Sequence, residues 1–132
     1  MAGFRVFELR TFADERGKLT PMELADFFDF AVKRVYTVHA NLATRGGHAH
    51  LQEEEFFFLT SGSVVAKLHD GEKWLEIAMT ANKEALYVGN HVWHQFEDFS
   101  EDAVLVALSS TNYNPERTDY IEDFNQFLNT KF

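Results

Sequence analysis

The sequence contains no cysteine among its 132 residues. It therefore has neither a disulfide framework nor a thiol nucleophile, and any bound metal would need nitrogen and oxygen ligands. No apolar run approaches the roughly 18 residues of a membrane span. The start of the chain also lacks a basic segment followed by an apolar core. We expect a cytoplasmic protein that does not enter a membrane.

Basic residues are scarce, with 12 Lys and Arg against 21 Asp and Glu and a formal net charge of −9. Binding to a nucleic-acid backbone needs clustered basic residues, so this balance argues against nucleic acid as a partner. A small anionic ligand held by a few local arginines is still compatible with it. The length fits one domain, 1–132, with one core.

The most informative stretch is Arg45-Gly46-Gly47-His48-Ala49-His50. Side chains on a β-strand alternate between its two faces, so His48 and His50 are expected to point into the same space. A pair of histidines spaced in this way is by itself a weak signal, because such positions are often ordinary polar sites on a half-solvated sheet. Its weight depends on the residues further along the chain.

Three more residues come after the histidine pair at defined intervals. Glu55 lies near the start of an apolar run that suggests a second strand beside the first, Gly62 lies in a Ser-Gly-Ser turn, and His94 comes after the Gly89-Asn90 turn. This order of His-x-His, Glu, Gly and a distant His is typical of the cupin pattern. Taken together, these residues favour a functional cluster over a chance arrangement.

The rest of the chain reads mainly as short strands separated by turns. Strand patterns cover 4–9, 33–39, 64–69, 74–79, 86–88, 92–96 and 103–108, and 22–30 reads as irregular or as one helical turn. The Asp70-Gly71 turn predicts a hairpin. Apolar spacing over 120–128 predicts a helix, with Tyr120, Phe124, Phe127 and Leu128 on one face. We expect an all-β jelly-roll barrel with a short C-terminal helix.

Two chemistries fit the predicted cluster. His48, His50, Glu55 and His94 form a mixed nitrogen and oxygen set for Fe, Mn, Ni or Zn. Without metal, a histidine could take a proton from a carbon next to a ketone and return it elsewhere, provided that a donor stabilises the enediolate. Tyr36, on a nearby strand, is a candidate donor, although a packed core tyrosine is an equally good interpretation.

The chain resembles the small cupins that act as dTDP-4-keto-6-deoxyhexose 3,4-ketoisomerases, grouped with WxcM-like proteins. The matching stretches span nearly the whole chain and are specific in their order and spacing. They are 14–19, 33–36, 45–50, 61–63, 86–88, 92–93, 98–105 and 119–121.

The resemblance implies a homodimer of jelly-roll subunits, often with exchanged N-terminal strands, that binds a dTDP-linked keto sugar in deoxysugar biosynthesis without a cofactor. It assigns proton transfer between C3 and C4 to His48, His50 and Tyr36, without deciding which histidine is the base. Arg45 and Arg16 match family arginines and are candidates for diphosphate or nucleotide contact. We also expect Trp93 and His94 to contact substrate, with Trp93 forming an aromatic wall together with Tyr36.

Glu55 departs from the family, which commonly has glutamine at this position. The departure restores the carboxylate of a metal-binding cupin, and His94 supplies the remaining ligand. The leading hypothesis is an isomerase that uses acid–base chemistry, and the alternative is a metal-dependent oxygenase or metal-assisted isomerase. A third hypothesis, a non-catalytic sugar-binding cupin, would keep Arg45 and the aromatic wall but tolerate loss of the histidines.

Overall fold

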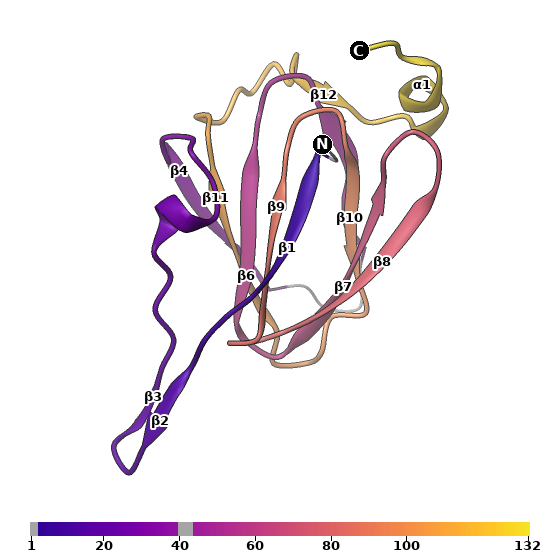
Figure 1. The fold of residues 1–132 in the computed structure, drawn as a ribbon. Coiled ribbons are helices and arrows are strands. Elements are labelled where there is room, and N and C mark those ends of the chain that lie inside the picture. The colour runs from indigo at the N-terminus through magenta and orange to yellow at the C-terminus, as the bar shows by residue number, and fades with distance from the viewer. Residues whose placement is uncertain (1–2, 40–43) are drawn as a thin grey trace.

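Two antiparallel five-stranded sheets face each other in the computed structural model, which describes residues 3–39 and 44–132 (Figure 1). One sheet has the strand order β1-β9-β6-β11-β4 and the other β12-β5-β10-β7-β8, while β2 and β3 form a separate hairpin. The strands are β1 Phe4–Glu8, β2 Phe12–Asp14, β3 Gly17–Leu19, β4 Arg34–Val38, β5 Arg45–His50, β6 Glu55–Ser61, β7 Ser63–His69, β8 Trp74–Thr80, β9 Glu84–Val88, β10 Trp93–Glu97, β11 Val104–Ser109 and β12 Tyr120–Ile121. The only helices of the described residues are a 3-10 turn, Leu24–Asp26, and α1, Phe124–Asn129. The predicted all-β class is confirmed.

The phenylalanine-rich strand β6 has both of its faces covered. Phe57 and Leu59 point between the sheets and join the main core, which also contains Leu68, Phe96 and Leu105. Alternation sends Phe56 to the outer face, where the ring packs against phenylalanines of β1 and of the segment around the 3-10 turn. A strand buried on both faces loses the polar alternation of a half-solvated strand, which explains the unbroken apolar run.

The prediction that β5 and the strand beginning at Glu55 lie side by side is wrong. β5 pairs with β10 and β12, whereas β6 pairs with β9 and β11 in the opposite sheet. The short connection between β5 and β6 therefore crosses from one sheet to the other. Glu55 consequently faces the histidines across the barrel rather than from a neighbouring strand.

The C-terminal helix is shorter than predicted. It begins after Asp123, whose side chain accepts a hydrogen bond from the amide of Gln126 and caps the N-terminus. Tyr120 and Ile121 instead form β12, in register with His50 and Ala49 of β5. Backbone pairing with an existing sheet edge takes precedence over the helical spacing of the apolar side chains. Tyr120 thus lies beside the histidines rather than on a helix.

The β2–β3 hairpin extends away from the two sheets (Figure 1). Its residues are exposed, and the hairpin turn carries the ion pair between Arg16 and Asp14, with a nitrogen–oxygen distance of 2.6 Å. Neither helix within the described residues is long and apolar enough to cross a membrane.

Candidate active site

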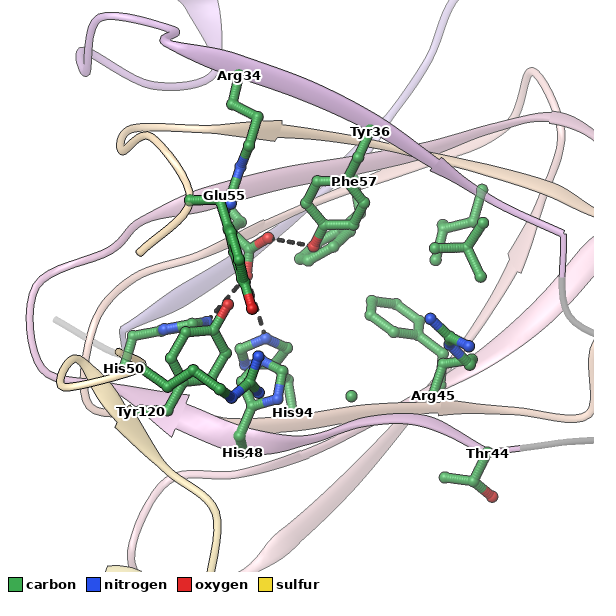
Figure 2. A pocket seen from close by; sticks show the side chains of 16 residues that line it. Arg34, Tyr36, Thr44, Arg45, His48, His50, Glu55, Phe57, His94 and Tyr120 are labelled. Carbon is green, nitrogen blue, oxygen red and sulfur yellow. Dashed lines mark hydrogen bonds and ion pairs between the residues drawn. The ribbon is translucent and has the colours of Figure 1, made fainter. Parts of the chain in front are cut away.

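A cavity of about 550 Å³ lies between the two sheets and contains most of the predicted site residues (Figure 2). Tyr36 and Glu55 reach it from β4 and β6 of one sheet. His48, His50 and His94 reach it from β5 and β10 of the other. The catalytic and metal-ligating candidates proposed from sequence therefore do converge on one space.

A backbone irregularity at Gly47 brings His48 opposite His94. Across the β5–β10 pair, His94 is the partner of His48 but the next residue, Gln95, is the partner of Gly46, so Gly47 is the extra residue of a bulge. Its φ of 76° lies in the left-handed region that favours glycine. The Gly-Gly pair before the His-x-His motif therefore helps to set the direction of the first histidine.

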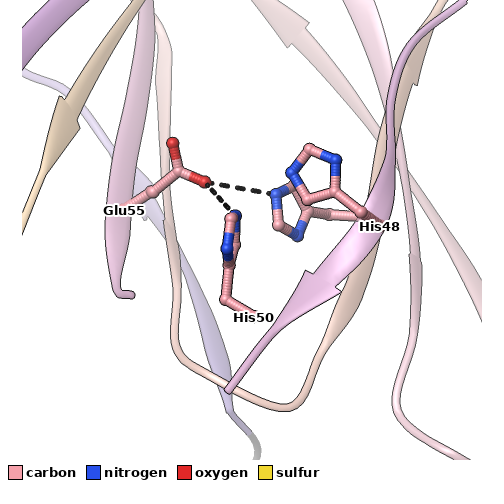
Figure 3. A group of neighbouring side chains, drawn as sticks. His48, His50 and Glu55 are labelled. Carbon is pink, nitrogen blue, oxygen red and sulfur yellow. Dashed lines mark ion pairs between the residues drawn. The ribbon is translucent and has the colours of Figure 1, made fainter. Parts of the chain in front are cut away.

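Glu55 is the group to which Tyr36, His50 and His94 are directed, and Figure 3 shows its ion pair with His50. The side chain is 1% exposed. Its Oε2 accepts a short hydrogen bond from the Tyr36 hydroxyl, and its Oε1 lies 3.3 Å from the Nε2 atoms of both His50 and His94. Burial alone would raise the pKa of this carboxyl. The two imidazoles outweigh burial and hold its pKa well below the ordinary value, so the group is ionised.

The ionised Glu55 raises the pKa of each neighbouring group, and burial and the other charges decide the final direction at each one. Burial raises the pKa of Tyr36, and the negative charge of Glu55 raises it further, so the hydroxyl keeps its proton. Burial lowers the pKa of His50, but Glu55, Glu53 and Asp119 outweigh burial and raise it above the ordinary value. For His48, burial and the neighbouring imidazoles of His94 and His50 lower the pKa to about 2. The site thus combines a neutral His48 with a His50 that favours the charged form.

The outer nitrogens of the two deepest histidines both meet oxygen acceptors. Nδ1 of His50 lies 3.1 Å from the Asp119 carboxylate, and Nδ1 of His94 lies 3.1 Å from the carbonyl of Val92. A carbonyl can only accept, so Nδ1 of His94 carries a proton, and a carboxylate favours the same state in His50. Both rings therefore direct Nε2 toward Glu55.

A second buried carboxylate, Glu53, lies behind His50. Its Oε2 accepts hydrogen bonds from the guanidinium of Arg34 at 2.9 Å and from the hydroxyl of Ser109 at 2.8 Å. Burial and the nearby charge of Glu55 raise the pKa of Glu53, although Arg34 opposes the shift. The Arg34 guanidinium also lies over the rings of Tyr36 and Tyr113, so it connects this network to the cavity wall.

The structure places two of the four residues predicted to bind substrate in the cavity and the other two outside it. Arg45 and His94 line the cavity, with Arg45 displaced along β5 from the histidines (Figure 2). Trp93 does not reach the cavity, which corrects the prediction of an aromatic wall. It precedes His94 on β10 and so faces the other way, where it packs on Phe124 and Phe127. Arg16, in the projecting hairpin, is not among the cavity residues either.

Several residues of the site were not predicted from the sequence. The Tyr120 ring centroid lies 4.5 Å from that of His50 and 4.9 Å from that of His48, and the Arg117 guanidinium lies 3.9 Å from the Tyr120 ring centroid. Arg34 could have been found, because it precedes Tyr36 by two positions on the same strand and therefore shares its face. Tyr120 was expected on a helix, and Asp119 lies in the polar segment before it. The stretch 119–121 matched the family but gave neither residue a role.

Three comparisons with known proteins agree with this arrangement. The family described as FdtA: WxcM-like, C-terminal matches residues 2–131. The chain is similar to a TDP-4-oxo-6-deoxy-alpha-D-glucose-3,4-oxoisomerase from Aneurinibacillus thermoaerophilus, with 35% identity over 125 residues, which cover 93% of this chain and 88% of the relative.

Two solved structures have the same fold over nearly their whole length. One is a double mutant of the QdtA 3,4-ketoisomerase from Thermoanaerobacterium thermosaccharolyticum in complex with TDP. Its TM-score is 0.86 at 32% sequence identity, and the match covers 97% of this chain and 93% of that chain. The other is the WlaRB TDP-quinovose 3,4-ketoisomerase from Campylobacter jejuni, at a TM-score of 0.86 and 30% identity, covering 98% of this chain and all of that one.

The network behind the site makes a prediction about stability. Replacing Arg34 in an Arg34→Met variant leaves the buried carboxylate of Glu53, which is 3% exposed, without its cation. We expect the free energy of unfolding to fall by about 2 kcal/mol, because the buried carboxylate loses a charge-assisted hydrogen bond and keeps only the Ser109 hydroxyl and the more distant His50 beside it. Urea denaturation of the variant and the unchanged protein measures the difference.

The matched control is Arg16→Met, which removes the exposed Arg16–Asp14 pair. That change should leave the denaturation midpoint unaltered, because an exposed ion pair contributes little. Equal midpoints for Arg34→Met and the unchanged protein would show that Glu53 does not depend on Arg34.

Proposed function

The chain belongs to the WxcM-like FdtA family and is a sugar 3,4-ketoisomerase, and we propose that His48, His50 and Tyr36 carry out its proton transfer. The substrate is a dTDP-4-keto-6-deoxyhexose. The observation on which the assignment of roles depends is that His48 faces the same cavity as the Tyr36 hydroxyl and the His50 ring, which are both held by Glu55.

The reaction exchanges a ketone and a neighbouring hydroxyl. A base removes the proton on C3, and the electron pair moves to form a C3–C4 enediolate with negative charge on the C4 oxygen. A donor must stabilise that charge. The donor gives a proton to the C4 oxygen, the base returns a proton to C4, and the donor takes back the proton on the C3 oxygen, which gives the 3-keto sugar. The site must therefore supply one acceptor for a carbon-bound proton and at least one donor for an oxyanion.

His48 is the base in this proposal. It is more exposed to the cavity than His50 and His94, which are each 2% exposed, and it makes no hydrogen bond with any of the described residues. Its pKa of about 2 means that the ring is neutral in the empty cavity and has a free electron pair. An enediolate that forms beside the ring favours its charged form, so proton affinity rises as the reaction proceeds.

His50 and Tyr36 are the donors. Their ionisable groups lie on opposite sides of Glu55, which keeps the hydroxyl of Tyr36 protonated and favours the imidazolium of His50. The His48 and His50 ring centroids are 4.6 Å apart, so acceptor and donor can serve adjacent carbons of one sugar ring. Arg45, at the far end of the cavity, is placed to contact the diphosphate.

The assignment predicts the kinetics of a His48→Asn variant. We expect kcat with dTDP-4-keto-6-deoxyglucose to fall by about 100-fold or more, because general base catalysis is lost, while KM changes little. Product formation is followed by NMR. The control is His39→Asn, because His39 is exposed and lies outside the cavity. Unchanged turnover in the His48 variant would exclude it as the base, and absence of turnover in the unchanged protein would favour a sugar-binding role.

A second candidate, a metal-assisted isomerase, is supported by the ligand spacing around Glu55. His50 Nε2 and Glu55 Oε1 are buried without a hydrogen-bond partner among the described residues, and their separation of 3.3 Å is long for a charge-assisted hydrogen bond. Metal–ligand distances of about 2.0–2.2 Å give ligand–ligand distances of roughly 3–3.5 Å. His48, His50, Glu55 and His94 therefore fit a divalent ion such as Fe, Mn, Ni or Zn. Such an ion, when bound, polarises a carbonyl oxygen.

Elemental analysis of the purified, untagged protein separates the two candidates. The acid–base mechanism predicts no stoichiometric Fe, Mn, Ni or Zn. Near-stoichiometric metal that disappears in Glu55→Gln would instead establish the metal-assisted mechanism. Glu54→Gln is the matched control, because Glu54 accepts a hydrogen bond from Tyr87 away from the cavity and should not affect metal content.

We also propose that the protein is a homodimer that associates through its N-terminal third. Four apolar side chains of β1–β4 are strongly exposed, namely Val6, Phe12, Leu19 and Val35, at 44–64%. An exposed apolar surface of this kind is typical of an association site. In such a dimer the hairpin of one subunit is available to the other, and this would allow Arg16 to act at a partner's cavity.

Sedimentation velocity tests the association. We expect a dimer at micromolar concentration and a shift to monomer in Leu19→Asp, because a charge is then buried in the contact. Leu128→Asp is the control, because Leu128 is similarly exposed at 43% but lies on α1. A monomeric unchanged protein would contradict the proposal.

A further inference from the structure

Asp119 lies immediately before β12 and contacts the ring of a proposed donor, His50, from the side away from the cavity. Its Oδ2 is 3.1 Å from His50 Nδ1. We propose that Asp119 is the positioning residue that holds the proton on Nδ1 of His50 and so directs Nε2 into the cavity. The inference rests on the proposed function, because it assigns a role to a residue that touches His50 and not the substrate.

The carboxylate of Asp119 is itself held in place from several directions. Oδ1 accepts a hydrogen bond from the amide of Gln52 at 2.7 Å, and Oδ2 accepts one from the amide of Glu53 at 3.1 Å. The backbone carbonyl of Asp119 accepts from the amide of Leu51 at 2.9 Å. The next residue, Tyr120, is the strand partner of His50. The position of the carboxylate is therefore fixed by backbone groups rather than by the histidine that it contacts.

The other nearby carboxylates do not fill the same role. Glu53 Oε1 is 3.7 Å from His50 Nδ1, which is too long for a hydrogen bond, and its Oε2 is occupied by Arg34 and Ser109. Glu55 lies on the opposite edge of the ring, at Nε2. Among the described residues, Asp119 alone is within hydrogen-bond distance of Nδ1.

The choice of nitrogen matters because two acceptors compete for the His50 proton. In a neutral ring, Glu55 would draw the proton to Nε2, where Oε1 has no other hydrogen-bond partner among the described residues. Asp119 draws it to Nδ1, so that Nε2, on the cavity side beside Glu55, is the nitrogen that takes up and releases the second proton. In a charged ring, Asp119 accepts a hydrogen bond from the Nδ1 proton. The Nε2 proton is then the one available for donation. A carboxylate that orients a catalytic or ligating imidazole in this way typically affects activity by 10-fold or more.

The first test uses the unchanged protein and needs no turnover. Long-range ¹⁵N–¹H NMR at neutral pH reports which ring nitrogens of each histidine carry a proton, and the His50 signals are identified by their loss in His50→Asn. We expect Nδ1 of His50 to be protonated, whether the ring is neutral or charged. A neutral His50 with its proton on Nε2 would overturn the proposal.

The second test uses Asp119→Asn, which keeps the side-chain size but removes the charge. We expect kcat to fall by about 10-fold or more with KM changed by less than about three-fold, because substrate contacts remain while the donor is misoriented. The NMR signal of Nδ1 should shift toward the unprotonated position in the same variant. An unchanged kcat, or an unchanged Nδ1 signal, would overturn the proposal.

The matched control is Asp123→Ala, which removes the cap of α1 four residues further along the same C-terminal segment. Asp123 caps α1 and does not contact a histidine, so its variant tests whether loosening this segment is enough to reduce turnover. We expect its kcat to stay within about two-fold of the unchanged protein, and a loss equal to that of Asp119→Asn would assign the effect to general destabilisation. If the unchanged protein turns over no dTDP-keto sugar, the proposed function fails, while the NMR measurements still decide the role of Asp119.

Discussion

The buried charge of Glu55 is the constraint on which the rest of the site depends. An ionised carboxylate that is nearly inaccessible to water is stable only if donors and positive charge replace its hydration. Tyr36, His50 and His94 provide them from three different strands. Because all three are directed at Glu55, their orientations are set before any substrate enters. His48 is the one histidine of the cavity that remains outside this arrangement.

The fold provides this convergence by placing β5 and β6 in opposite sheets. Glu55 and Tyr36 then face the three histidines from the opposite sheet, and Phe57 and Phe96 of the main core line the space between them. Strand alternation assigns His94 to the inside and its neighbour Trp93 to the outside, where α1 covers it. The aromatic residue that borders the histidines from the tail is instead Tyr120, which β12 delivers.

The same donor set explains why acid–base and metal-assisted chemistry are close alternatives here. A proton on an imidazole and a divalent ion both neutralise Glu55, and both need Nε2 of His50 and His94 to face the carboxylate. Asp119 and the Val92 carbonyl produce that orientation in either case, since they occupy the Nδ1 atoms. The outer contacts of the histidines are therefore as much a part of the site as the side chains in the cavity.

The sequence by itself determined the features that depend on local periodicity. Alternation along single strands was enough to predict the all-β class and the shared face of His48 and His50, because both concern side chains a few residues apart. The tertiary structure alone decided the pairing of β5 with β12, the position of Glu55 across the cavity, and the contacts of Tyr120 and Asp119 with His50. These contacts join residues about 70 positions apart, as His50 and Asp119 show. Their geometry depends on which strands pair, and side-chain spacing within one segment carries no information about that choice.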